Sequence, residues 1–296
     1  MKKSNAAVIA LAAAVGLAAG CAPFAARRVK ANAERVITFQ RNDEPDEKIG
    51  SAFDRIKPAE MVPARLKTYD TRTLELLFEA ADLTADMRDR PELTGVLEDI
   101  FQEALSRGFV GDMITQLHRR YVAERQWGKD RALFQRFPSK ERELPQIVEP
   151  AAVAVDGPAA YDVSPDGKRL TLEAVDLVSR PLIVAVVDAG CHFSQDADSV
   201  IAADPELSKA FAESAVNIYP AHYELNAEEV AETNRKGKAR VKILYKASGW
   251  KGFDFRGTPH FYFLKDGKVV DEIEGMHPAK FAAELKRGVA RLGPRP

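Results

Sequence analysis

Apolar residues recur at helical spacing between residues 70 and 144. After Asp70, a residue type that favours helix N-caps, they follow every third or fourth position as Leu74, Leu77, Phe78 and Ala81. A longer amphipathic stretch runs from Pro91 to Gly108, and two shorter ones follow it. These patterns predict a small all-helical domain over residues 70–144. Within it we expect Trp127 at the edge of the core and His118-Arg119-Arg120 on a solvated face.

The spacing changes after the proline- and alanine-rich residues 145–160. Apolar runs of strand length, rich in β-branched residues, replace the helical pattern. The predicted strands are 161–163, 170–172, 182–187, 215–219, 261–264 and 269–273. Helices are predicted from 192 to 203, from Pro205 onward and after Gly275, and a helical segment is predicted around 241–245. A buried strand followed by helical crossovers implies an α/β domain over residues 145–296.

The first twenty residues have the pattern of an export signal. Lys2 and Lys3 precede an apolar stretch, residues 6–19, which is too short to span a bilayer and ends in small residues. We therefore expect residues 1–20 to be a signal peptide. Residues 21–69 are charged, contain proline and show little apolar periodicity, so the sequence predicts a tether there.

Residues 17–21, Leu-Ala-Ala-Gly-Cys, resemble the lipobox of bacterial lipoproteins. The resemblance implies that Cys21 is linked to diacylglycerol, and Ala22 is similar to the residue of lipoproteins that are sorted to the outer membrane. The implied location is the cell envelope, facing the periplasm, with the membrane as a partner through the lipid anchor. The alternative is a plain signal peptide that is cleaved nearby, with an incidental cysteine.

Charge and cysteine content exclude several classes of function. The formal net charge is -1 with both signs mixed along the chain, which indicates no nucleic-acid groove. The chain has 2 cysteines, so lipidation of Cys21 would leave Cys191 as the remaining thiol and exclude an internal disulfide. We find no nucleophile elbow, phosphate-binding glycine loop or zinc-spaced histidine pair, and we predict no cofactor and no metal.

Three separated motifs resemble the thioredoxin superfamily. Cys191-His192-Phe193-Ser194 follows a buried strand, where that family has Cys-x-x-Cys at the start of a helix. Asp204-Pro205-Glu206-Leu207 is similar to the next helix start in its periplasmic, membrane-tethered branch. Gly257-Thr258-Pro259, with the hairpin at 263–269, resembles its cis-proline loop. The resemblance implies a thioredoxin-like domain over residues 145–296, preceded by the all-α domain.

The resemblance also implies a role for each motif residue. Cys191 would be the nucleophile, with its thiolate favoured by the helix N-terminus, and His192 would add positive charge beside it. Thr258 and Pro259 would contact the client peptide. Three departures from the family pattern are Ser194 in place of the resolving cysteine, Gly190 in place of tryptophan and Ala185 in place of a buried acid. Because the second thiol is missing, a dithiol cycle is excluded.

Three functional hypotheses follow. The leading one is a monothiol domain that forms mixed disulfides with, reduces or isomerises oxidised cysteines of client proteins through Cys191. The alternative is a degenerate, non-catalytic binding module or adaptor. A third is copper binding by Cys191, His192, His260 and Met276-His277. The expected partners are client thiols or disulfides, and the sequence indicates no oligomeric state.

The lipobox resemblance leads to a first prediction. The wild-type chain, expressed in a Gram-negative host, should incorporate labelled fatty acid and partition into detergent. Cys21→Ser should do neither, because the thioether needs the sulfur, whereas Cys191→Ser should behave as the wild type. Equal labelling of wild type and Cys21→Ser would exclude lipidation at this position.

Overall fold

The computed structural model describes residues 6–293 except 89, 140–142, 152, 154–155, 189, 221–223 and 238–239, with side chains from residue 24 onward. Backbone contacts divide the chain into two compact units, Met1–Tyr121 and Val122–Pro296. No helix in the described part of the chain is both long and apolar enough to cross a membrane.

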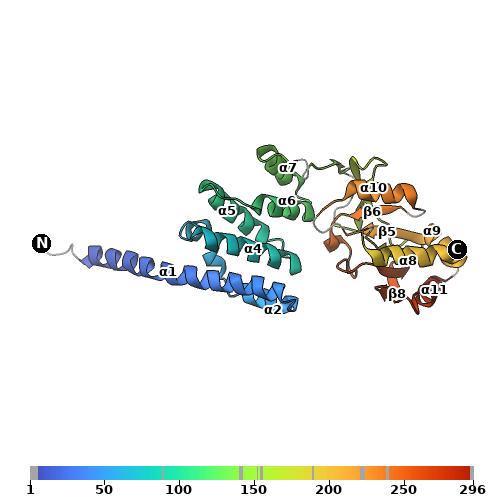
Figure 1. Ribbon diagram of the computed structural model, residues 1–296, viewed down its shortest axis with the longest axis horizontal. Helices are drawn as coiled ribbons and strands as arrows, with labels where there is room; N and C mark the ends of the chain where they lie inside the picture. The colour runs from blue at the N-terminus through green and yellow to red at the C-terminus, as the bar shows by residue number, and fades with distance from the viewer. Residues whose placement is uncertain are drawn as a thin grey trace. The chain divides into compact units, whose positions relative to one another are not determined.

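The first unit is built from helices (Figure 1). In chain order they are α1 (Ala6–Arg41), α2 (Asp46–Phe53), the 3-10 helix η1 (Pro58–Glu60), α3 (Pro63–Leu66), α4 (Thr71–Met87), α5 (Leu93–Ser106) and α6 (Met113–Ala123). Asp70 caps α4 as its residue type predicts, because its side chain accepts a hydrogen bond from the Thr73 N–H at 2.7 Å.

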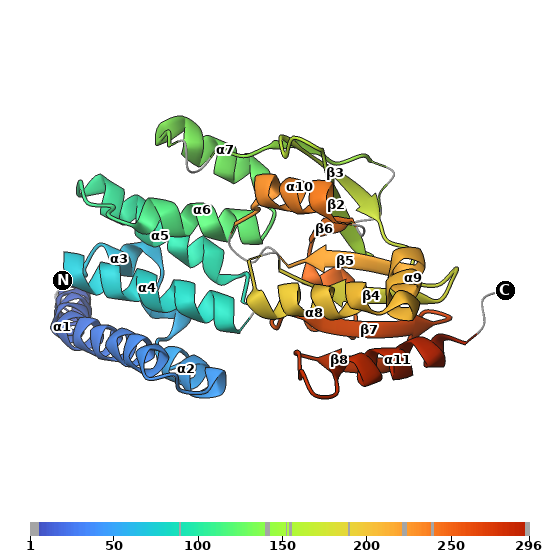
Figure 2. The same ribbon diagram turned by 45° about the vertical axis from the view of Figure 1, so that its right-hand side comes forward.

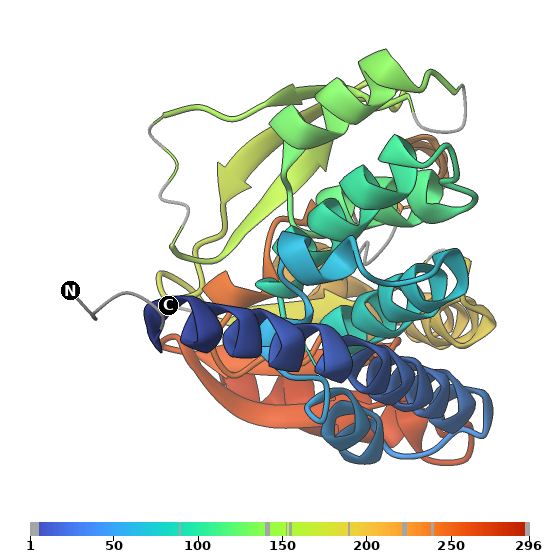
Figure 3. The same cartoon turned by 90° about the vertical axis from the view of Figure 1, so that its left-hand side faces the viewer.

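The predicted tether at residues 21–69 is wrong for much of its length. Within α1, Val29, Ala33, Val36 and Ile37 are buried at helical spacing, and α1 packs against α4 and α2 (Figure 3). Ile49, Phe53, Ile56, Leu66 and Tyr69 are buried as well. Many charged residues between these apolar positions made the segment look unstructured. Burying one apolar face is nevertheless sufficient to fix a helix whose other face is solvated.

Two of the basic residues expected on a solvated face are buried instead. His118 is 9% exposed and Arg120 is 6% exposed, whereas Arg119 is exposed. The Arg120 guanidinium donates to the Asp82 carboxylate at 3.1 Å and to the Asp82 carbonyl at 3.0 Å. A buried arginine needs such partners, so this contact explains why a charge occupies the inner face of α6.

The second unit is an α/β domain around one mixed sheet (Figure 2). Its helices are α7 (Trp127–Arg136), α8 (His192–Ala203), α9 (Pro205–Ser214), α10 (Ala227–Lys236), the 3-10 helix η3 (Ala247–Gly249) and α11 (Phe281–Leu292). Its strands are β1 (Gln146–Val148), β2 (Ala159–Val163), β3 (Arg169–Ala174), β4 (Leu182–Val186), β5 (Ala215–Tyr219), β6 (Val241–Leu244), β7 (His260–Lys265) and β8 (Lys268–Glu274).

The strand order is β1-β3-β2-β6-β5-β4-β7-β8. The motif strand β4 is buried at all five positions and lies between β5, which is parallel, and β7, which is antiparallel. The β7–β8 hairpin turns through Asp266 and Gly267, whose φ angles of 51° and 73° are those of a type I′ turn. The predicted strands are therefore present. The segment at 241–245 is a strand and not a helix, with β-branched Val241 and Ile243 paired into the sheet.

The two faces of the sheet are covered by different kinds of structure. Apolar residues of α8, α9, α10 and α11 form one cluster with Ile183, Ala185 and Phe261, and α8 to α10 lie in front of the sheet in Figure 2. On the other face, Val184, Val186, Tyr262 and Leu264 pack with Trp250, Phe253 and Phe255. An aromatic loop segment thus takes the place of a helix on this second face.

The boundary between the units lies at Tyr121–Val122 and not at the predicted position 144–145. Residues just after α6 belong to the sheet domain. The Arg125 guanidinium is buried and donates to the carbonyl oxygens of Tyr245 at 2.8 Å and Leu244 at 2.6 Å. Burial lowers the pKa of Arg125 to about 10, and the side chain still stays charged at neutral pH.

Trp127, like Arg125, binds the segment after α6 to the sheet domain. Its side chain is 5% exposed, and its indole N–H donates to the Tyr161 hydroxyl at 3.0 Å and to Glu149 Oε1 at 2.9 Å. The Tyr161 hydroxyl in turn donates to the same carboxylate oxygen at 2.5 Å. The prediction that Trp127 belongs to a core edge is confirmed, but the core is that of the sheet domain.

These contacts predict which fragment folds by itself. A fragment of residues 122–296 should unfold in one cooperative transition. A fragment of residues 145–296 should be less stable by at least about 3 kcal/mol, the usual cost of removing a buried tryptophan side chain. Urea titration followed by near-ultraviolet circular dichroism compares the two. Equal stability of both fragments would show that residues 122–144 are not part of the domain.

Candidate functional site

The motif cysteine lies in the turn between the buried strand β4 and helix α8. Cys191 is the N-cap residue of α8, and its carbonyl accepts the first helical hydrogen bond from the Gln195 N–H at 3.1 Å. Its own N–H donates to the Asp188 carbonyl at 3.0 Å, which closes the turn between strand and helix. The side chain is half-buried, and the sulfur lies at the positive end of the helix dipole.

The predicted cis-proline loop faces this sulfur. The Thr258–Pro259 peptide bond is cis, and the Thr258 carbonyl oxygen lies 3.8 Å from Cys191 Sγ, within reach of an S–H donor. The Gly275 N–H donates to the Pro259 carbonyl at 2.9 Å, which fixes the loop to the end of β8. The structure thus brings together Cys191, Thr258 and Pro259, which are far apart in the sequence.

The surroundings of Cys191 favour its thiolate. Partial burial raises the pKa of the thiol, but hydrogen bonds from the backbone N–H groups of Ser194 and Phe193 and from the Thr258 and Ser194 side chains lower it by more. The net pKa lies below the ordinary value for cysteine. The stabilising groups are mainly donors on the first turn of α8, as expected for a thiol at a helix N-terminus.

Ser194 has a structural role as well as an electrostatic one. Its side chain is 2% exposed, and its Oγ accepts a hydrogen bond from the Asp188 N–H at 3.2 Å. The same hydroxyl is among the groups that lower the pKa of Cys191. One buried hydroxyl therefore joins the end of β4 to the first turn of α8 and supplies a donor to the sulfur.

The two residues between Cys191 and Ser194 are exposed. Phe193 is 47% exposed, and the His192 ring lies against it with the centroids 3.9 Å apart. The main groups that shift the pKa of Cys191 are backbone and hydroxyl groups, so the positive charge expected from His192 is not among them. His192 and Phe193 instead present a small aromatic surface beside the sulfur.

Ala185, which stands in place of the expected buried acid, is enclosed by the packing of β4. Ala185 is 1% exposed and packs in the helix-covered core, with Phe261 and Asn217 opposite it on the neighbouring strands. Asp188 Oδ1 accepts from the Gly190 N–H at 2.9 Å, and a Glu229 carboxylate oxygen lies 3.6 Å from where a Cβ on Gly190 would be.

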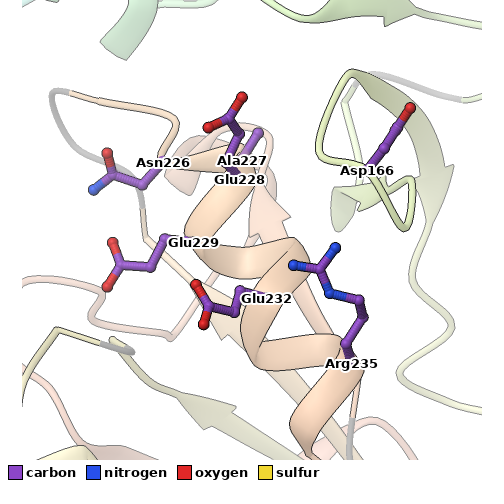
Figure 4. Close-up of a pocket in the computed structure, with 7 residues that line it drawn as sticks. All are labelled: Asp166, Asn226, Ala227, Glu228, Glu229, Glu232 and Arg235. Atoms are coloured by element: carbon purple, nitrogen blue, oxygen red, sulfur yellow. The ribbon is translucent and has the colours of Figure 1, made fainter.

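A separate hollow of about 600 Å³ lies at the start of α10 (Figure 4). Its lining consists of Asp166, Asn226, Ala227, Glu228, Glu229, Glu232 and Arg235 and does not include Cys191. The Arg235 guanidinium donates to the Pro165 carbonyl at 3.1 Å. Four carboxylates and one arginine make this surface acidic, and it brings no nucleophile or thiol together with them.

One histidine of the copper hypothesis, His260, has other partners. His260 is 3% exposed, and both of its ring nitrogens have hydrogen-bond partners, Glu272 and Tyr262. Within the described residues, no group of three His, Cys, Asp or Glu side chains is placed to hold a metal ion. Sequence reasoning considered His260 only as a metal ligand and missed this hydrogen-bond network. The available signal was a histidine directly after the cis-proline, where a buried strand begins.

Comparison with known proteins agrees with this geometry. Residues 169–288 match the family model described as thioredoxin-like domain, so the C-terminal unit is a thioredoxin-like domain that follows a helical region. A crystal structure of a thioredoxin-like protein from Bacteroides caccae ATCC 43185 is 15% identical and covers 81% of this chain and 84% of that chain. Its TM-score of 0.32 is too low to establish a shared overall structure. No curated protein matches the sequence.

The lowered pKa of Cys191 predicts a pH-dependent stability. The folded state binds its thiol proton less tightly than the unfolded state, whose cysteine pKa is about 8.5. The free energy of unfolding of the wild type, relative to Cys191→Ala, should therefore rise with pH through the window between the two pKa values. It should be constant below the folded-state pKa. Urea titrations from pH 5 to pH 9.5 measure the difference.

Ser194→Ala provides the control for this prediction. It removes one hydroxyl that lowers the Cys191 pKa, so the rise in the free energy of unfolding with pH should be smaller. Ser199→Ala, on the exposed side of α8, should leave it unchanged. A stability difference that does not vary with pH would contradict the lowered pKa.

Proposed function

We propose that this chain is an envelope lipoprotein whose thioredoxin-like domain captures oxidised cysteines of client proteins through Cys191. The observation that carries the proposal is the position of Cys191 Sγ at the N-terminus of α8, opposite the Thr258 carbonyl before a cis-proline. Among the residues whose side chains the structure describes, Cys191 is a free cysteine. Anchoring through Cys21 would hold the domain at a membrane surface.

The proposed reaction is thiol–disulfide exchange. The Cys191 thiolate attacks one sulfur of a client disulfide, a bond forms between these two sulfurs, and the second client sulfur leaves as a thiolate. No net oxidation or reduction occurs in this step. The mixed disulfide then persists until a thiolate from the client or from a small external thiol attacks the client sulfur and releases Cys191. Ser194 cannot perform that second step, because a hydroxyl does not displace a thiolate.

A non-catalytic binding module is the second candidate. The observation in its favour is Ala185, which packs in an apolar core and offers no proton acceptor behind the thiol. Under this hypothesis the exposed Phe193 and the cis-proline loop would bind a partner without covalent chemistry. The two candidates differ in one measurable property, which is whether partner capture requires the Cys191 sulfur.

The thiol hypothesis predicts the effect of restoring a second cysteine. Ser194→Cys places a thiol three residues after Cys191 on the first turn of α8, where side chains at that spacing are neighbours. The variant should form a disulfide with Cys191 under mild oxidation and reduce insulin with dithiothreitol as electron donor. It should also retain fewer mixed-disulfide partners on non-reducing gels than the wild type.

Ser199→Cys is the matched control, because it lies eight positions along the helix from Cys191, a rise of about 12 Å that is beyond bridging distance. It should form no internal disulfide and reduce no insulin. Cys191→Ala should capture no partner. If Ser194→Cys neither forms the disulfide nor reduces insulin, and capture survives in Cys191→Ala, the binding-module hypothesis replaces the thiol hypothesis.

A further inference from the structure

The loop that faces Cys191 is continuous with the segment that covers the second face of the sheet. Trp250, Phe253 and Phe255 pack on that face, and the chain then passes through Arg256 and Gly257 to Thr258 and Pro259. Any group that fixes this segment therefore also fixes the position of the Thr258 carbonyl.

The Tyr262 hydroxyl holds the covering segment by its backbone. It accepts a hydrogen bond from the Asp254 N–H at 2.7 Å, and it lies 3.2 Å from the Asp254 carbonyl oxygen and 3.1 Å from His260 Nδ1. Burial raises the pKa of Tyr262 to about 12, so the hydroxyl keeps its proton for one of these two acceptors. The Asp254 carboxylate is held at a pKa of about 2 mainly by hydrogen bonds with Arg256.

His260 connects this tyrosine to the edge strand. Its Nε2 lies 2.8 Å from Glu272 Oε1, and its ring stacks on that of Tyr262 with the centroids 4.2 Å apart. A carboxylate only accepts hydrogen bonds, so Nε2 carries a hydrogen. In the neutral ring Nδ1 then accepts from the Tyr262 hydroxyl. A chain of hydrogen bonds runs from Glu272 through His260 and Tyr262 to the backbone of Asp254.

We propose that His260 is a positioning residue for the Cys191 site, which it orders through Glu272 and Tyr262 by fixing the backbone on both sides of Thr258-Pro259. The inference rests on the proposed thiol function. His260 directly follows Pro259, and the Asp254 backbone lies on the other side of the loop, so the network restrains the loop at two points. The ordered loop places the Thr258 groups that bond the sulfur.

The test uses the full chain and the rate at which iodoacetamide alkylates Cys191, measured from pH 5 to pH 10. Glu272→Ala removes the acceptor of the His260 N–H. The rate at pH 7 should fall by about threefold to fivefold, the equilibrium effect of losing one hydrogen bond of ordinary strength, and the profile should move to higher pH. Glu272→Gln keeps an acceptor oxygen and should stay close to the wild type. The Glu272 side chain is 54% exposed, so these variants should fold.

Glu274→Ala is the matched control, because it removes the same charge from the same face of β8, opposite His260 in the register. It should leave the profile unchanged. A purely electrostatic effect would change the alkylation rate in the direction opposite to that expected for Glu272→Ala. Removing any nearby carboxylate favours the thiolate and raises the rate. If Glu272→Ala, Glu272→Gln and Glu274→Ala all raise the rate, or if Glu272→Ala changes nothing, the positioning role is wrong.

His260→Phe replaces the imidazole with another aromatic ring but loses both hydrogen bonds, and it should change the rate in the same direction as Glu272→Ala. Urea titration of each variant separates loss of folding from loss of positioning, since a purely structural role lowers stability without moving the alkylation profile. The proposed function is judged separately by partner capture. A shifted profile in Glu272→Ala with no captured client would support the positioning role and reject the client-capture function.

Discussion

The burial of β4 on both faces is the constraint on which the site depends. All five residues of this strand are buried, so the sheet needs a cover on each side, and the chain that leaves the strand must turn at its edge. That turn brings Cys191 to the start of α8, where free backbone N–H groups are available to a sulfur anion. The chemistry of the thiol therefore follows from where a fully apolar strand is forced to end.

The two covers have different consequences for the site. Helices bury the face that contains Ala185, and helices are held internally by their own hydrogen bonds. The other face is covered by the aromatic residues Trp250, Phe253 and Phe255 on a segment with little regular structure. Such a segment needs side chains to satisfy and order its backbone, and Tyr262 and His260 do so. Because this segment continues into the cis-proline loop, packing and site geometry are coupled there.

Local sequence patterns predicted much of the fold and the motif residues of the site. The run of β-branched residues in β4, the Asp-Gly turn and the Asp70 and Asp204 caps each act through neighbours in the sequence. The failures share a different cause. Residues 21–69 are predicted to be a tether because the buried positions from Val29 onward are scattered among charges, and 241–245 is predicted to be helical because so short a segment shows no clear period. The role of Arg125 depends on carbonyl groups about 120 residues further along the chain, and that of His260 on the pairing of β7 with β8; local spacing reveals neither.

Ser194 separates two properties that a second cysteine would combine. A thiol at this position would both interact with the Cys191 sulfur and attack a mixed disulfide, whereas the hydroxyl supplies only the first. The serine is also buried and bonded to the Asp188 N–H, so it contributes to the geometry of the strand-to-helix turn. Replacing it by an apolar residue would leave that half-buried N–H without this acceptor, at a cost of about 1–3 kcal/mol where no water takes its place. A hydroxyl at this position thus contributes to the fold independently of any resolving step, and it also stabilises the Cys191 thiolate.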